Sequence, residues 1–327
     1  MPVNDKIRAP DYNDIRNKIN STYGPGSGTS GYGQTLRSTP VNESNRVTVN
    51  EWGNLRFDII NAWRHIFGVT PTIVLPTISD TIRYSETFVP DSGASDEPVT
   101  QFDTYCNLIS ANRFTVHPSQ SATSAAASGS TVWPGPYGAF WTSRLQCTVT
   151  ASWLSADRAR YFFNSGGQLR IASSRSGGST TQQSNSWTSI LSAAGTIAFG
   201  AVVPEPNTSP ADGRNFYRCT SNYQPIFSGA GSTPYGSNSY TVYVRTPGIA
   251  DNSTGTAATV EFLLDFIDNY VDPGNSLYDT PDTIDAIDGT FAVNVSTLFA
   301  TGVLEPPGTG SFTVEQPSIT VGAIAPV

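Results

Sequence analysis

The sequence predicts a mainly β protein with a small α component, in which an N-terminal helical pair precedes antiparallel β-sandwich or barrel-like modules. First, the chain of 327 residues contains 29 glycines and 23 prolines but only 13% charged residues, which is typical of turn-rich β proteins. Second, apolar and polar residues alternate over several short segments, as in strands with one buried face. Third, helical spacing of apolar residues occurs mainly in the first 69 residues.

These observations divide the chain into three expected parts. Residues 1–69 form an N-terminal helical docking arm, 70–204 a β-rich domain with two short helices, and 205–327 a C-terminal β domain with an acidic loop. The linker between the two helices of the arm is rich in glycine and serine, so it can extend and let each helix dock separately. The β body from about residue 70 has its own alternating strands, so we expect it to fold without the arm.

The arm contains two amphipathic helices. The first is predicted over Asp11–Tyr23 and ends at Gly24, and the second follows a capping box of Thr48 and Glu51 and ends at Gly68. Their apolar faces are too wide to cover each other alone, so a partner subunit or the β domain must cover them. The residues predicted for this assembly interface are Tyr12, Ile15, Ile19, Trp52, Leu55, Ile59 and Trp63.

The second part begins with predicted strands and ends with two helix–glycine–strand units. Residues 119–130 are nearly all Ser, Ala, Thr and Gln, which predicts a loop or flexible flap. The predicted strands before the first helix are 72–75, 81–88, 114–117 and 144–153. The two units comprise helices over 156–164 and 186–194 and strands over 168–174 and 196–203.

The third part is predicted to be all β. Val260, Phe262, Leu264 and Phe266 alternate with other residues, as in a half-buried strand. Proline and glycine turns separate these strands, which favours a sandwich or an open barrel. The remaining predicted strands are 215–219, 240–245, 291–295, 312–314 and 319–321.

Several short segments resemble virion structural proteins of tailed bacteriophages, and the similarity is closest to contractile-tailed, cyanophage-like phages. The longest is Ala156–Ile171, which reads Ala-Asp-Arg-Ala-Arg-Tyr-Phe-Phe-Asn-Ser-Gly-Gly-Gln-Leu-Arg-Ile. The resemblance implies a tail, baseplate, neck or fibre component located in the virion, and it brings no catalytic motif with it. The other similar segments are Asp11–Ile15, Gly31–Gln34, Pro281–Thr283, Val293–Ser296 and Pro317–Val321.

The charge distribution is uneven along the chain. The net charge is −8, which argues against nucleic acid or an anionic membrane as a partner. Up to Arg245 there are 18 basic and 15 acidic residues, whereas the chain after it has 11 acidic residues and no basic one. This asymmetry predicts either a face that meets a basic neighbour or a face kept repulsive for solubility.

The sequence predicts no enzymatic activity and no cofactor or metal. Cys106, Cys147 and Cys219 are widely spaced and match no zinc or redox motif, so we expect free buried thiols. The two histidines, His65 and His117, match no catalytic or metal-binding pattern. The acidic stretch 265–288 lacks the spacing of an EF-hand, and we expect a solvated loop or interface, with a Ca²⁺ site as the open alternative.

Aromatic residues in predicted loops suggest a second kind of contact. Trp133, Tyr137 and Tyr235 lie near glycine and proline, where exposed rings can stack on sugars, but we favour core or subunit packing for these rings. We expect a structural virion protein that binds copies of itself and other virion proteins. Two alternatives remain: a receptor- or carbohydrate-binding tail fibre protein that contacts a host surface glycan, and a capsule-degrading depolymerase.

Overall fold

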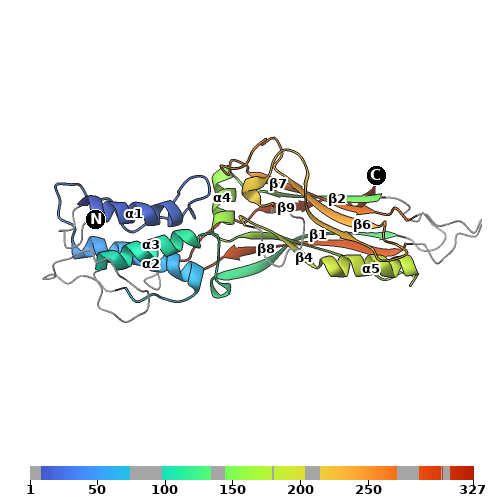
Figure 1. Cartoon of the computed structure of the whole chain (residues 1–327), viewed down its shortest axis with the longest axis horizontal. Helices are drawn as coiled ribbons and strands as arrows, with labels where there is room; N and C mark the ends of the chain where they lie inside the picture. The colour runs from blue at the N-terminus through green and yellow to red at the C-terminus, as the bar shows by residue number, and fades with distance from the viewer. Residues whose placement is uncertain are drawn as a thin grey trace, which may run out of the picture. The chain divides into compact units, whose positions relative to one another are not determined.

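A computed structural model describes residues 9–73, 98–133, 144–178, 180–202, 214–270, 287–302, 304 and 310–327 (Figure 1). Of the described residues, about 30% are helical and 31% lie in strands, so the predicted combination of antiparallel sheets with some helix is confirmed, but the helical share is larger than expected. Contacts divide the chain into two compact units, and this division differs from the three expected parts. The helical unit comprises Met1–Ala122, Arg160–Gly167 and Phe299–Glu315, and the sandwich unit comprises Thr123–Ala159, Gln168–Leu298 and Gln316–Val327.

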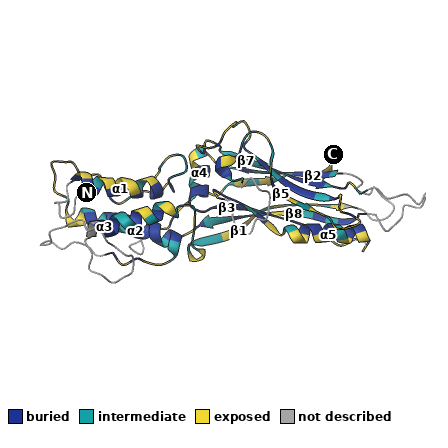
Figure 2. Cartoon of the chain, in the orientation of Figure 1, coloured by how far each residue is buried: buried dark blue, intermediate teal, exposed yellow. Residues whose placement is uncertain are grey.

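The helical unit is built on three helices, where the sequence predicted a pair. They are α1 (Ala9–Tyr23), α2 (Val49–Phe67) and α3 (Pro98–Ala111), and each packs on the other two. The ends of α2 are set by local chemistry as predicted, because the Thr48 N–H donates to the Glu51 carboxylate and Gly68 adopts a left-handed φ of 77°. Buried residues recur every three to four positions along α1, as expected for a helix with one covered face (Figure 2).

Helix α3 was missed from the sequence, where strands and loops were expected. Its side chains Phe102, Tyr105, Cys106 and Ile109 are buried at the spacing of one helix face. The same core contains Phe312 from near the C-terminus, whose ring lies 6.0 Å from Tyr23 and 5.8 Å from Tyr32. The hydrophobic core of this unit therefore joins segments from both ends of the sequence.

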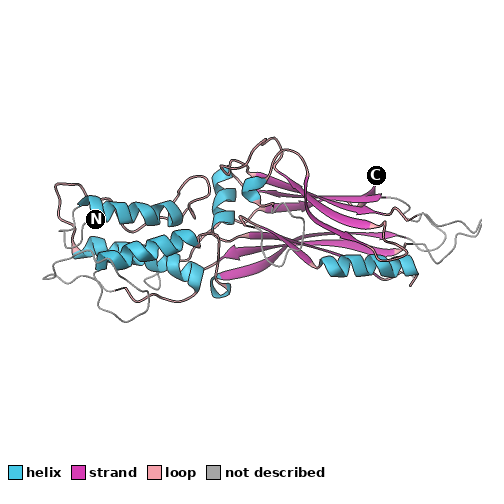
Figure 3. Ribbon diagram, in the orientation of Figure 1, coloured by secondary structure: helices cyan, strands magenta, loops and turns pink. Residues whose placement is uncertain are grey.

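The sandwich unit consists of two antiparallel sheets (Figure 3). The four-stranded sheet has the order β1-β8-β3-β4, and the six-stranded sheet has β10-β2-β7-β6-β5, with β9 also pairing with β2. The strands of the first sheet are β1 (Ser121–Trp133), β3 (Gln168–Ser176), β4 (Thr196–Phe199) and β8 (Gly289–Ala300). Those of the second are β2 (Arg144–Ser152), β5 (Gln224–Ala230), β6 (Ser239–Arg245), β7 (Thr259–Ile267), β9 (Ser318–Val321) and β10 (Ala325–Pro326).

The two sheets pack face to face through aromatic residues. Phe266 of β7 meets Phe291 of β8 at 5.8 Å between ring centroids, and Phe199 of β4 meets Phe262 of β7 at 5.3 Å. Trp187 of helix α5 (Gln182–Ala194) contacts Phe266 and is fully buried. This packing confirms the predicted antiparallel sandwich.

The remaining helix bounds agree with the sequence closely. Helix α4 (Ala156–Asn164) has the predicted ends, and α5 begins four residues earlier than predicted and ends before Gly195 as expected. Phe162 and Phe163 are both fully buried.

Several predicted segments differ in the structure. Residues 119–130 were predicted as a loop, but most of them form β1, because pairing with β8 supplies hydrogen bonds that composition does not reveal. Residues 114–117 and 312–314 form no strand, and 215–219 contains the 3₁₀ turn η2 (Phe216–Arg218). Residues 74–75 and the predicted strand 81–88 lie outside the described residues.

Candidate functional site

The residues predicted for an assembly interface lie in the core of the helical unit. The Tyr12 ring meets Trp52 edge-on at 5.3 Å, Trp52 meets Phe102 at 5.0 Å, and Trp63 meets Tyr105 at 4.7 Å. Helix α3 therefore covers the apolar faces that we expected a partner subunit or the β domain to cover. The seven buried residues are Tyr12, Ile15, Ile19, Trp52, Leu55, Ile59 and Trp63, and none is more than 7% exposed.

The aromatic residues predicted to stack on sugars do not form a common surface in the described structure. Tyr235 is 4% exposed, and its ring packs edge-on against Tyr270 at 4.7 Å. Its burial agrees with the packing role that we favoured for these rings and excludes the alternative that this ring stacks on a ligand. The backbone of Trp133 ends β1, and its side chain and all of Tyr137 lie outside the described residues.

The acidic residues at the two ends of the stretch 265–288 are bound within the sandwich unit. Asp265 accepts two hydrogen bonds from the Arg144 guanidinium, at 2.7 and 2.6 Å. Asp268 accepts two from the Gln183 side-chain amide, at 2.9 and 2.8 Å. Within the described ranges no group of three His, Cys, Asp or Glu side chains is arranged to hold a metal ion. The acids between 271 and 286 lie outside those ranges.

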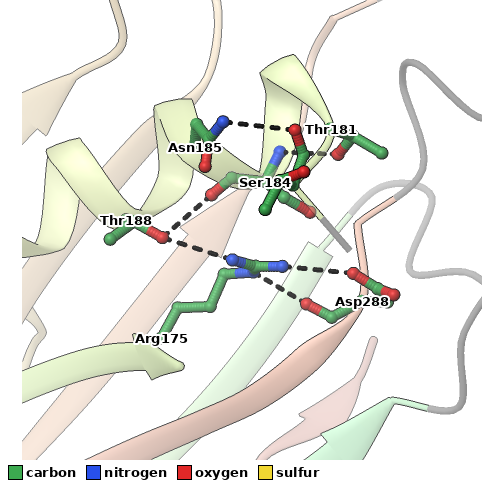
Figure 4. Close-up of polar contacts among 7 residues, drawn as sticks. Arg175, Thr181, Ser184, Asn185, Thr188 and Asp288 are labelled. Atoms are coloured by element: carbon green, nitrogen blue, oxygen red, sulfur yellow. Dashed lines mark hydrogen bonds and ion pairs between the residues drawn. The ribbon is translucent and has the colours of Figure 1, made fainter. Parts of the chain in front are cut away.

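Asp288, the last acid of the stretch, forms a buried ion pair with Arg175 (Figure 4). Arg175 Nε donates to the Asp288 backbone carbonyl at 2.7 Å, and Nη2 donates to Asp288 Oδ1 at 3.1 Å. Nη1 donates to Thr188 Oγ1 at 3.3 Å, and that hydroxyl donates to the Ser184 carbonyl at 3.0 Å. This network ties α5 to β3 and to the start of β8.

Both charged side chains of this pair are almost fully buried, with 4% and 5% of their surface exposed. Burial lowers the pKa of Arg175, and the neighbouring Asp288 carboxylate opposes that shift. Arginine stays protonated in proteins, so Arg175 and Asp288 form an ion pair in the folded state. The network is a structural anchor, because each of these polar groups is bound to another part of the same chain.

The thiols and the histidines also have structural surroundings. The three cysteines are buried and free, as predicted, and burial raises the pKa of Cys147 to about 11 and of Cys219 to about 12. His65 is buried, and its ring stacks on Phe312 at 4.6 Å with an interplanar angle of 11°. Burial lowers the pKa of His65 to about 3, so the folded protein holds a neutral imidazole at pH 7.

Acidification is expected to destabilise the helical unit through His65. The pKa of His65 is about 3 in the folded state, below the ordinary value of about 6.5. The stability that the neutral ring contributes to the folded protein is therefore fully present above pH 6.5 and is lost as the pH falls towards 3. The expected loss is about 1.4 kcal/mol per pH unit, or roughly 3 kcal/mol between pH 6.5 and pH 4. Urea denaturation at a series of pH values measures it.

The matched variant for this measurement is His65→Leu. Burial raises the pKa of the Asp58 carboxyl, so acidification stabilises the folded state through Asp58 and opposes the effect of His65. The difference in the free energy of unfolding between wild type and His65→Leu therefore isolates the contribution of the histidine. The free energy of unfolding of wild type relative to His65→Leu should fall with acidification. Parallel pH profiles for the two proteins would contradict the buried neutral imidazole.

One hollow on the sandwich unit is lined mainly by polar and small side chains. It lies over the outer face of the four-stranded sheet, with a volume of about 340 Å³. Arg170 of β3, Asn294 and Ser296 of β8 and Thr196 of β4 line it together with the small residues of β1. The Arg170 Nε donates to Gln168 Oε1 at 3.1 Å, so the guanidinium is partly oriented before any ligand binds. No local sequence pattern predicts this hollow, because its residues come from four separate strands.

None of the described helices is long and apolar enough to cross a membrane. Comparisons of the chain with known protein families, with curated proteins and with solved structures found no match.

Proposed function

We propose that this chain is a non-enzymatic structural protein of a tailed-bacteriophage virion. It acts as a tail, baseplate, neck or fibre component, through contacts with copies of itself and with other virion proteins. The observation that carries the proposal is the outer edge of β1. This edge is long, and among the described residues no strand pairs with it.

The sheets have four edges, and β1 differs from the other three. Strand β4 has four residues, and β5 contains Pro225 and a register shift beside it. At the remaining edge β9 has four residues and β10 has two, one of which is Pro326. Short strands, proline and bulges are the usual devices that prevent unwanted pairing. The 13 residues of β1 include no proline and no charged residue, which suits an edge that pairs with another chain.

The virion assignment is supported by the segments that resemble phage structural proteins, because two of them make contacts that fix the helical unit. The Arg160 guanidinium donates to the backbone carbonyls of Ser30 and Pro25, the second at 3.0 Å. The Asn164 amide donates to the Gly31 carbonyl at 3.1 Å. A Cβ at Gly33 would come within 2.3 Å of the Tyr161 ring, so only glycine fits there. The resemblance thus concerns residues that determine this fold.

Immunogold electron microscopy tests the virion proposal. Antibodies raised against the purified chain are expected to label intact tailed particles at a repeated position on the tail, baseplate, neck or fibres. The control is the same serum after absorption with the purified chain, which should remove the label. Protein found in infected cells but absent from purified particles would refute the proposal.

A second candidate function, binding of a host surface glycan, is favoured by the hollow beside Arg170. Its side chains offer hydrogen-bond donors and acceptors without a deep apolar pocket, which suits a hydroxyl-rich ligand better than an apolar one. A glycan array probed with the purified protein tests this candidate. Binding that Arg170→Ala weakens would support it, and an array without signal would reject it.

A further inference from the structure

We infer that β1 pairs in antiparallel register with β1 of a second copy of this chain, with the twofold axis at Ala127. The two four-stranded sheets would then form one continuous sheet across the axis. This inference rests on the proposed function, since it names the surface and the partner of a subunit contact.

The backbone of β1 provides the binding groups. A strand rises about 3.4 Å per residue, so an edge of 13 residues is on the order of 40 Å long, more than twice that of a typical strand. At a sheet edge alternate residues point their N–H and C=O groups away from the sheet, where another strand can bind them. Thr123, Ala126, Ser128 and Ser130 are exposed, and Val132 is 69% exposed. The described part of the chain therefore leaves this edge open.

The side chains of β1 favour a second copy over an unrelated strand. The sequence Thr123–Thr131 reads Thr-Ser-Ala-Ala-Ala-Ser-Gly-Ser-Thr, which is nearly the same in both directions about Ala127. Antiparallel pairing centred there places threonine opposite threonine and serine opposite serine, and such cross-strand pairs are favourable. The resulting pairs are Thr123 with Thr131, Ser124 with Ser130, Ala125 with Gly129 and Ala126 with Ser128.

Charge is also compatible with self-association at this edge. Each copy has a net charge of −8, so two copies repel each other over most of their surfaces. Between 121 and 133 there is no charged residue, so this edge can meet itself without placing like charges opposite each other. An edge with lysines or glutamates would not allow this.

The two faces of β1 show where substitutions can be made. A Cβ at Gly129 would come within 2.8 Å of Val321 on β9, so at this position the strand is closely packed against the other sheet. Ala126 and Ser128 lie on the opposite, exposed side. Longer side chains at these two positions therefore leave the sandwich core unchanged.

The test is a pair of double variants that differ at one position. In the proposed register residue 126 of each copy lies opposite residue 128 of the other. Ala126→Lys with Ser128→Lys places lysine opposite lysine twice, whereas Ala126→Lys with Ser128→Glu places lysine opposite glutamate twice. We expect the first variant to raise the dimer Kd by roughly tenfold or more relative to the second. Sedimentation equilibrium gives the Kd values, and equal melting temperatures show that both variants are folded.

The wild-type chain is expected to be a dimer, and the lysine–glutamate variant should remain one. A monomeric wild type, or a dimer that both variants leave unchanged, would overturn the inference. Equal weakening in both variants would also overturn it, because the register would not be the one proposed. A chain that labels phage particles but stays monomeric refutes this pairing and leaves the proposed function intact. A dimer that is absent from particles refutes the proposed function alone.

Discussion

Replacing Arg175 with methionine is expected to lower the free energy of unfolding of the sandwich unit by about 3–5 kcal/mol. The substitution leaves the Asp288 carboxylate 5% exposed without its guanidinium partner, and a buried charge without a partner is strongly unfavourable. The hydrogen bond to Thr188 is lost as well, which removes one polar link between β3 and α5. Urea denaturation followed by tryptophan fluorescence measures the change.

Two further variants show whether the effect comes from the buried charge. Arg175→Met combined with Asp288→Leu removes both charges, and it should recover much of the lost stability. Arg245 forms an ion pair with Glu261 in the same unit but is 34% exposed, so Arg245→Met should cost about 1 kcal/mol or less. If Arg175→Met cost no more than Arg245→Met, the buried network would not have the role described.

The ends of the helices could be predicted from the sequence because they depend on neighbouring residues. Thr48 and Glu51 fix the start of α2, and glycines at 68 and 195 end α2 and α5. The same holds for the strands of the third part that alternate regularly, such as β7. In these segments the chemical signal and the structure it specifies lie within a few residues of each other.

Strand β1 could not be predicted in this way. Ser, Ala and Thr have no alternation to read, and the segment becomes a strand because β8, far away in the sequence, pairs with it. Helix α3 is a different case, since Phe102, Tyr105, Cys106 and Ile109 do carry a helical spacing. That signal was available in the sequence, but the segment was assigned to strands and loops.

The buried polar network was beyond sequence reasoning for a similar reason. Arg175 and Asp288 are 113 positions apart, so no local pattern connects them. The excess of acids after Arg245 was correctly noted, but its interpretation as an external face was incomplete. Three of those acids, Glu261, Asp265 and Asp288, bind arginines from earlier strands of the same unit. Part of the charge asymmetry is therefore balanced inside the sandwich unit.

The apolar faces of α1 and α2 illustrate what periodicity alone leaves open. A wide apolar face shows that something must cover it, but it does not show what does. We expected a partner subunit or the β domain, and the structure places α3 and Phe312 there. This changes the expected behaviour of the chain when its first 69 residues are altered.

Trp52→Ala is expected to lower the free energy of unfolding of the helical unit by about 3–5 kcal/mol. The indole is 1% exposed and lies between the rings of Tyr12 and Phe102, so its removal leaves a large cavity among three helices. The matched control is Phe57→Ala on the same helix. That ring is only partly buried and has the Arg37 guanidinium 4.6 Å from its centre, so its loss should cost about 1 kcal/mol.

Removing residues 1–69 altogether should have the largest effect of any change considered. The deletion uncovers Phe102, Tyr105, Ile109 and Phe312, all of which are at most 4% exposed in the whole chain. We therefore expect the truncated protein to bind a hydrophobic dye strongly and to aggregate, even if the sandwich unit, which has its own core, still melts cooperatively. Replacing those four residues with serine or threonine in the truncated protein should restore solubility, because the exposed apolar surface causes the aggregation. A truncated protein that stays soluble, does not aggregate and binds no dye would show that α1 and α2 form a separable arm, as the sequence alone suggested.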